Sequence, residues 1–440
     1  MRALGRQWAA RPRPSAAALL IIAVGLIAAV TIVVGTALVL CGRDIGAPLP
    51  PTLFRFRPAF GPLAPLAAAL LALGVVAAPA LGAPRVRPPA FALAATALAL
   101  VLRVALNVAR AGPVDLWIFF DPRFGEGTVE YLAALPALEF GPLLFLDRFA
   151  EIASALPVHA AGHPPGLLTL VAVLGIETAP ALAALVIGVG VLAVPLTYLL
   201  GRGLLDEEAT ARAATLLLVF CPSALLYGAS AADALFATLG TFAALALVCR
   251  RRLARLVGGP AALAAAFFFS YANLAVGAWA AVTLWLREGA RSGLTTAAAT
   301  AVGLVSALVA AWALTGFDPL GSLAATEAVY RVSIARSRPY PYFVFGAPVA
   351  WMLALGPPVA VLWLRSVGAR RAPALALAAV VAASALAGFT KGETERIWLF
   401  LVPLACVAAA PALPRRWLVP VLAMLAVQAF LMQVLLGTVW

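Results

Sequence analysis

Long apolar runs, separated by short stretches that carry the charges, constrain the fold of this chain more than any motif does. The runs lie near residues 15–40, 62–83, 89–107, 179–200, 211–227, 232–249, 258–272, 274–287, 294–314, 346–364, 373–389, 396–412 and 417–437. A membrane-spanning helix needs about 20 mostly apolar residues. Only 11% of this chain is charged, whereas a soluble domain carries about a quarter. We therefore predict an all-α polytopic membrane protein with about 11–13 transmembrane helices.

The arginines predict how these helices are oriented, because cytoplasmic loops retain Arg and Lys. Basic residues precede the first run and then recur in alternate loops, at Arg2, Arg6, Arg11, Arg13, Arg85, Arg87, Arg202, Arg250, Arg251, Arg252, Arg255, Arg287, Arg291, Arg365, Arg370, Arg371, Arg415 and Arg416. The net charge of +13 follows this loop pattern, so the lipid bilayer and not nucleic acid is the predicted partner. We predict a cytoplasmic N-terminus, with segments 108–178, 315–345 and 390–395 outside the membrane.

One integral membrane domain is predicted over residues 1–440. Three spans occupy residues 15–107, an acidic extracytoplasmic loop follows over 108–178, and the remaining spans lie in 179–437. Arginine outnumbers lysine thirty to one and alanine is abundant. This usage is typical of a GC-rich bacterial genome, so the bacterial plasma membrane is the predicted location.

The acidic loop is the first place to look for function. Residues 109–165 hold seven of the eighteen carboxylates and both histidines. Residues 125–140 place Glu126 and Glu130 four apart on one face, with apolar residues on another, which predicts a short helix on the membrane surface. Residues 142–159 repeat this amphipathic pattern, with Asp147 and Arg148 on the polar face.

A GHPPG turn at residues 162–166 follows these two segments. Its prolines hold an extended turn that leaves His163 at the mouth of the next apolar run. His159 and His163 have a spacing that binds metal on a continuous helix, but Gly162 and Pro164 disfavour such a helix here. No metal site and no other cofactor is therefore predicted.

The order of these features resembles the C-type (GT-C) glycosyltransferases, in particular the protein mannosyltransferase and aminoarabinose transferase branch. In that family a first external loop carries Asp/Glu-x-x-Tyr, followed by a Lys/His-Pro-Pro-small turn and a helix ending in Leu-Gly-Arg. The corresponding stretches here are GEGTVEYLAALP, GHPPGLLTLVAVLG, PLTYLLGRGLLDEEATARAA and CPSALLYGASAADALFATLGTFAALALVCRRR, within residues 109–290. Two departures are the additional spans before the loop and Gly125-Glu126 in place of an adjacent Asp-Glu pair.

The resemblance implies transfer of a sugar from a polyprenyl-phosphate donor to an extracytoplasmic glycan, lipid or protein. Such a reaction requires a carboxylate that deprotonates the acceptor hydroxyl and a cation that stabilises the leaving phosphate. Glu130 is the first candidate for the base, and the departure from the family motif leaves Asp121, Glu126 and Asp115 open as well.

Arg396 is the leading candidate for the donor phosphate, because a guanidinium offers a fixed fork of donors to phosphate oxygens. Arg338 with Tyr340 is the second. Other residues predicted to contact substrate are Tyr131, Asp147, Arg148, His163 and Glu395.

Each candidate also has a simpler interpretation. Glu126 and Glu130 fit the solvated face of a surface helix, Asp147 and Arg148 fit a surface ion pair, and Arg396 fits an interfacial residue that reaches toward water. A polytopic transporter or lipid flippase, or a membrane protein without chemistry, is the alternative to a glycosyltransferase. Transporters usually keep ionisable residues near the midplane of their spans, and these runs are nearly free of charge.

Overall fold

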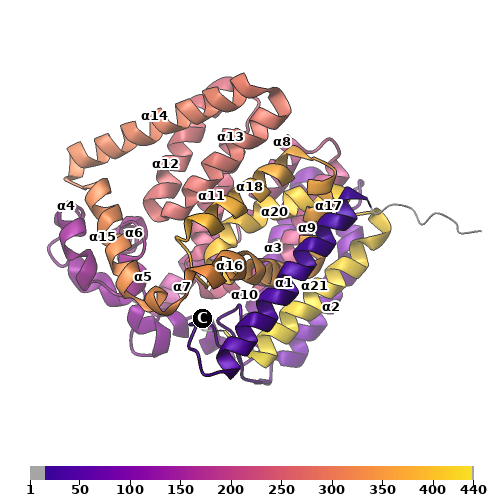
Figure 1. Cartoon of the computed structure of the whole chain (residues 1–440), viewed down its shortest axis with the longest axis horizontal. Coiled ribbons are helices and arrows are strands. Elements are labelled where there is room, and N and C mark those ends of the chain that lie inside the picture. The colour runs from indigo at the N-terminus through magenta and orange to yellow at the C-terminus, as the bar shows by residue number, and fades with distance from the viewer. Residues whose placement is uncertain (1–14, 439–440) are drawn as a thin grey trace, which may run out of the picture.

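The computed structural model describes residues 15–438, which fold almost entirely into helices (Figure 1). The first three apolar runs form α1 (Ala16–Leu40), α2 (Ala64–Leu81) and α3 (Pro88–Asn107). Within the described residues, strands are limited to β1 (Arg55–Phe56) and β2 (Leu436–Gly437), which pair antiparallel. The all-α class is confirmed, while the arginines before residue 15 lie outside the described residues.

The acidic loop folds into a series of short helices. They are η1 (Pro113–Leu116), η2 (Ile118–Phe120), η3 (Gly125–Val129), η4 (Tyr131–Leu138), α4 (Pro142–Ile152), η5 (Ala153–Ala155), α5 (Val158–Ala161) and α6 (Gly166–Val173). As predicted, no continuous helix joins His159 to His163, since α5 ends before the GHPPG turn.

The predicted surface helix over residues 125–140 is wrong. Two 3-10 segments, η3 and η4, occupy this stretch, and Glu130 lies between them in an extended conformation with ψ −179°. Glycines at 125 and 127 are poor helix formers, and Pro136 removes a backbone donor. Instead of lying on a surface, η4 buries Tyr131 and Leu132 in the core.

The amphipathic pattern of the next segment is confirmed. In α4 the rings of Phe145 and Phe149 are buried, whereas Asp147 and Arg148 are exposed. α4 and η5 pack against α15 (Pro319–Val332), so the two long segments predicted to lie outside the membrane are neighbours in the structure (Figure 1).

The remaining helices form the rest of the bundle. They are α7 (Ala179–Gly190), α8 (Ala193–Leu204), α9 (Glu208–Phe220), α10 (Pro222–Ser230), α11 (Asp233–Leu247), η6 (Ala254–Gly258), α12 (Gly259–Phe269), η7 (Tyr271–Asn273), α13 (Leu274–Glu288), α14 (Ala290–Thr315), η8 (Ile334–Ser337), α16 (Tyr340–Leu355), α17 (Pro357–Gly368), α18 (Ala372–Ala387), α19 (Thr394–Ile397), η9 (Trp398–Leu401), α20 (Val402–Ala409), η10 (Ala410–Ala412), η11 (Arg415–Trp417) and α21 (Leu418–Leu435).

Among the described residues, seven helices are long and apolar enough to cross a membrane, or nine if each of two bent pairs counts as one span. Three shorter apolar helices, α11, η6 with α12, and α18, lie beside them. This supports a multi-pass membrane protein. Crossing by the shorter helices, which the predicted total of 11–13 spans requires, stays a prediction.

The apolar run at 346–364 is two helices and not the single span predicted. α16 and α17 meet at an angle of 113°. Gly356 takes φ +99° at the junction, a conformation that favours glycine, and Pro357 begins the next helix because it needs no N–H partner there. A second pair, α9 and α10, bends by 58° before Pro222.

Burial separates a protein core from the helices at the periphery. Every residue of α10 and α20 is buried, whereas none of the apolar window of α14 is. α14 runs along one edge of the molecule, where it packs on α12 and α13 (Figure 1). Because its large exposed side chains from Leu294 to Leu314 are apolar, this edge is suited to contact with lipid.

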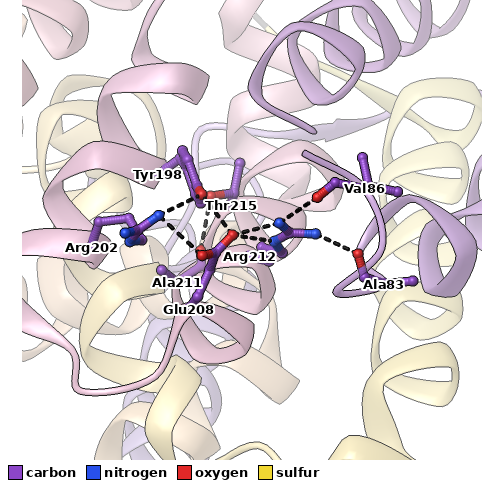
Figure 2. A network of polar contacts seen from close by, with 8 residues as sticks. All are labelled: Ala83, Val86, Tyr198, Arg202, Glu208, Ala211, Arg212 and Thr215. Atoms are coloured by element: carbon purple, nitrogen blue, oxygen red, sulfur yellow. Dashed lines mark hydrogen bonds and ion pairs between the residues drawn. The ribbon is translucent and has the colours of Figure 1, made fainter. Parts of the chain in front are cut away.

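The loops predicted to be cytoplasmic gather around one cavity of about 850 Å³, which is lined by parts of the turns before α3, α9, α18 and α21. Beside it, Arg212 donates to Glu208 and to the carbonyls of Ala83 and Val86 (Figure 2). Glu208 also accepts from Tyr198 at 3.0 Å. These hydrogen bonds connect the start of α9 to the turn between α2 and α3.

Candidate functional site

A cluster of charged side chains inside the fold joins three segments that are far apart in the sequence. Asp233 lies at the start of α11, Arg396 on α19, Glu393 just before it, and Arg338 after η8. Nη1 of Arg396 is 2.7 Å from Oδ2 of Asp233, and its Nη2 is 3.0 Å from Oε2 of Glu393. Nη2 of Arg338 is 2.8 Å from the other oxygen of Glu393. We call these four residues, together with Glu130, the site cluster.

The backbone at Glu393 is strained, which is common at functional sites. Glu393 takes φ +59°, in the left-handed region that costs a non-glycine residue about 1–3 kcal/mol. Arg338 and Arg396 both donate hydrogen bonds to its carboxylate and so stabilise this backbone conformation. They also lower its pKa, so that despite burial, which raises it, the pKa of Glu393 falls to about 2. Glu393 is therefore ionised and neutralises part of the arginine charge.

Glu130 enters the site cluster from the junction of η3 and η4, where its side chain is only 3% exposed. Burial raises the pKa of its carboxyl to about 8, although Arg396 lowers it in part. Within the described residues, Oε2 of Glu130 has no hydrogen-bond partner. A carboxyl whose pKa lies near neutrality and whose oxygen is available is suited to general acid–base chemistry.

Two histidines flank Glu130. Nε2 of His159 is 3.9 Å from Oε1 of Glu130, which is beyond hydrogen-bond range, and burial lowers the pKa of His159 to about 3. His159 is therefore neutral and does not form an ion pair with the carboxylate. Nδ1 of His163 lies 2.9 Å from the carbonyl of His159, and its ring contacts those of Tyr131 and Phe236.

Three more of the predicted site residues lie at this cluster. Tyr131 is buried, and its hydroxyl has no partner among residues 15–438. Glu126, on η3, is half-buried; its pKa is raised by burial and by the nearby charge of Glu393. Glu395 is buried and accepts from the backbone N–H of Leu53 at 2.9 Å, which ties the loop after α1 to α19.

The structure places the other predicted residues in different surroundings. Both oxygens of Asp121 are bound by Arg123, whose hydrogen bonds lower the pKa of Asp121. Asp115 accepts from the N–H of Ala111 at 2.6 Å in its own turn. The hydroxyl of Tyr340 donates to the carbonyl of Leu386.

Asp147 and Arg148 are exposed on α4, where Arg148 also bonds Glu151 at 3.0 Å. Their arrangement fits the simpler interpretation, a surface ion pair of small energy. The corresponding interpretation of Arg396 is wrong: its side chain is only 4% exposed and does not reach toward water, because two carboxylates bind it inside the fold.

Sequence reasoning did not include Asp233, Glu393 and His159 among the site residues. Asp233 had a detectable signal, since a carboxylate at the edge of an apolar run requires a partner. Glu393 was adjacent to the chosen Arg396. His159 was considered only as a metal ligand together with His163, because its burial near Glu130 depends on the fold of the whole loop.

Within residues 15–438, no group of three His, Cys, Asp or Glu side chains is arranged to hold a metal ion. Comparisons of the chain with protein-family models, with curated proteins and with solved structures found no match. The function must therefore be argued from the site cluster itself.

Proposed function

We propose that this protein is a membrane glycosyltransferase that transfers a sugar from a polyprenyl-phosphate donor to a hydroxyl of an extracytoplasmic glycan, lipid or protein. One observation carries the proposal: the buried carboxyl of Glu130, which has a pKa near 8 and an oxygen without a hydrogen-bond partner among residues 15–438, lies near the buried Arg396. The resemblance of residues 109–290 to the GT-C family supports the same chemistry.

The charges within the site cluster suggest the role of each residue. Asp233 and Glu393 offset the two arginines, which leaves Glu130 as the carboxyl without an arginine directly bound. In the proposed reaction Glu130 accepts the proton of the acceptor hydroxyl. The acceptor oxygen then bonds to the anomeric carbon as the bond to the phosphate oxygen breaks, and the lipid phosphate leaves with the electron pair.

Arg396 is proposed to stabilise the leaving phosphate by its charge. Two of its nitrogens already bind carboxylates, so this stabilisation acts through the electrostatic potential of the cluster and not through an unoccupied fork. Glu130 is 3% exposed, so an acceptor hydroxyl can reach it only after a neighbouring segment moves. The half-buried Glu126 on η3 lies near Glu130 and Arg396.

The test is to incubate purified protein with a panel of polyprenyl-phosphate sugars and to measure loss of donor by mass spectrometry. Turnover that disappears in Glu130→Gln supports the proposal. A parallel arm with a chelator tests for metal dependence. If no donor in the panel is consumed, and lipid-linked sugars in membranes are consumed equally with and without the protein, the proposal is wrong.

The orientation is tested by cysteine labelling in intact cells, after the exposed Cys41 and the three other native cysteines are replaced. An impermeant maleimide should label a cysteine at Thr128 and leave one at Ala209 unlabelled, because the arginine pattern places these loops on opposite sides. Labelling at position 209 alone would invert the orientation and put the site cluster on the wrong side for an extracytoplasmic acceptor.

A transporter or lipid flippase is the second candidate, and two features favour it. The pairs α9–α10 and α16–α17 are bent by 58° and 113°, and interrupted helices near buried charges are common in transporters. Purified protein in liposomes distinguishes the two functions. A transporter moves the lipid-linked sugar across the bilayer and leaves it chemically intact, whereas a glycosyltransferase cleaves the sugar–phosphate bond.

A further inference from the structure

A groove of about 700 Å³ lies between α1 and α16, beside the site cluster. Val30, Val34 and Leu38 line it from α1. They are spaced four residues apart and so form one row along one face of that helix. Phe345 lines the groove from α16 and is half exposed. The volume is within the range of about 300–1,000 Å³ that is typical of ligand pockets.

The groove is open toward the bilayer. In α1 only Thr31 and Gly35 are buried, and Val30 and Val34 are 60% and 45% exposed. Because α1 is apolar throughout, these side chains face lipid tails in a membrane. The row on α1 therefore offers a continuous apolar surface along which a hydrocarbon chain can lie.

One end of the groove is basic. Arg43 and Arg336 line it, and among residues 15–438 neither guanidinium has a hydrogen bond or an ion pair. Asp44 also lies there, but its Oδ1 accepts from the N–H of Gly46 at 2.8 Å. Tyr342 also lines the groove, but its hydroxyl is buried and lies close to Gly35 of α1.

The basic end adjoins the site cluster. Arg338 is two residues after Arg336, and a side chain at Gly46 would collide with it, so the loop after α1 covers Arg338. Arg338 bonds Glu393, which in turn bonds Arg396. Both arginines of the site cluster are therefore engaged by carboxylates, whereas Arg43 and Arg336 are available for an anion.

We infer that this groove binds the polyprenyl-phosphate part of the donor, an inference that rests on the proposed function. The single prenyl chain lies along α1 and Phe345, and the phosphate is bound by Arg43 and Arg336. This position assigns the binding of the phosphate to Arg43 and Arg336, while Arg396 and Arg338 contribute only the charge of the neighbouring site cluster.

The experiment measures binding separately from transfer. The dissociation constant of geranylgeranyl phosphate, a short single-chain prenyl phosphate, is determined with the purified full chain. Arg43→Ala with Arg336→Ala should raise it by about 10- to 100-fold, because two charge-assisted hydrogen bonds are lost. Arg331→Ala is the matched control, since Arg331 is also exposed but pairs with Glu327 on α15.

A second pair of variants tests the apolar wall without changing charge. Val34→Trp should fill the groove and abolish binding, whereas Val33→Trp, on a part of α1 that does not line it, should bind normally. Both positions are exposed, at 45% and 66%, so neither tryptophan disturbs the core. Geranylgeraniol tests the contribution of the phosphate and should bind weakly.

The outcomes separate the groove from the proposed function. If the arginine and Val34 variants bind geranylgeranyl phosphate and turn over donor like the parent, the groove inference is overturned and the glycosyltransferase proposal stands. If phosphatidic acid or inorganic phosphate competes as well as geranylgeranyl phosphate, the groove is not a prenyl-phosphate site. If binding behaves as expected but no sugar is transferred, the groove stands and the proposed function fails.

Discussion

Two arginine–carboxylate networks in this protein are built from the same chemistry and differ in one respect. In the network around Arg212, the guanidinium donates to Glu208 and to the carbonyls of Ala83 and Val86 (Figure 2). The guanidinium also lies over the ring of Phe91, 5.1 Å from its centroid. Glu208 in turn binds Tyr198 and Arg202. Such a network fastens two turns together and leaves no strong acceptor for a ligand.

The site cluster is incomplete by comparison. Its arginines are bound by carboxylates as Arg212 is, but Oε2 of Glu130 and the hydroxyl of Tyr131 lack partners within the described residues. A buried polar group without a partner costs about 1–3 kcal/mol. Stability alone does not favour such groups, so the comparison suggests that the first network is structural and the second is a site for chemistry.

The strongest test of that difference removes the base. Glu130→Gln keeps the size of the side chain but loses its basicity, so we expect transfer to slow by about 10²–10⁴-fold while donor binding is kept. Donor turnover and the donor dissociation constant are measured on the same purified variant. Asp121→Asn, Glu126→Gln and Asp115→Asn are the comparisons. Full activity in all four variants would show that the acidic loop is not catalytic.

Removing an arginine from the site cluster should reduce stability more than removing one from the Figure 2 network. Arg396→Ala leaves Asp233 and Glu393 buried without their shared partner, which we expect to cost about 3–5 kcal/mol. The double variant Arg396→Ala with Asp233→Ala should lose less free energy of unfolding than the two single variants lose together, because the two side chains interact directly. Unfolding in detergent measures both; additive losses would indicate that the ion pair contributes nothing.

The pH dependence of transfer sharpens the assignment of the base. Because the pKa of Glu130 is raised to about 8, the carboxyl is mostly protonated at pH 6 and becomes an active base as the pH rises. We expect the rate to increase roughly 100-fold between pH 6 and pH 9 and then to level off. Glu130→Gln should lose this rise. A rate that is flat over that range in the parent would assign the proton transfer to another group.

The Figure 2 network should affect stability without affecting chemistry. Arg212→Ala removes charge-assisted bonds to Glu208 and to two carbonyls, with an expected cost of about 1.5–3 kcal/mol in the free energy of unfolding. The protein that remains folded should transfer sugar at the parent rate. Reduced turnover per folded molecule would show that the two networks are coupled.

The smallest effect is expected on α4. Arg148 is exposed and pairs with Asp147 and Glu151, so Arg148→Ala should change stability by less than about 1 kcal/mol. Turnover should be unchanged, since among residues 15–438 no hydrogen bond or ion pair links this side chain to the site cluster. A large loss of donor turnover would restore Asp147 and Arg148 as substrate-binding residues.

The sequence by itself determined the helical character of the chain and most of the apolar helices long enough to cross a membrane. Apolar runs predict helices because a bilayer offers backbone groups no partner outside the segment. The same reasoning correctly placed the polar face of α4. It failed at 125–140, where two glycines and Pro136 favour 3-10 turns, and at Gly356, where one residue with positive φ divides a run into two helices.

Only the tertiary structure decided which of the predicted residues form a site. Asp233 and Arg396 are 163 residues apart, and no local pattern shows that they pair. The pKa of Glu130 is raised by burial, which depends on segments from across the chain. Burial and charge pairing are properties of neighbours in space, whereas helix formation depends on residues close in sequence. For that reason the sequence could identify Glu130 as a candidate base, whereas its burial and raised pKa are decided by the tertiary structure.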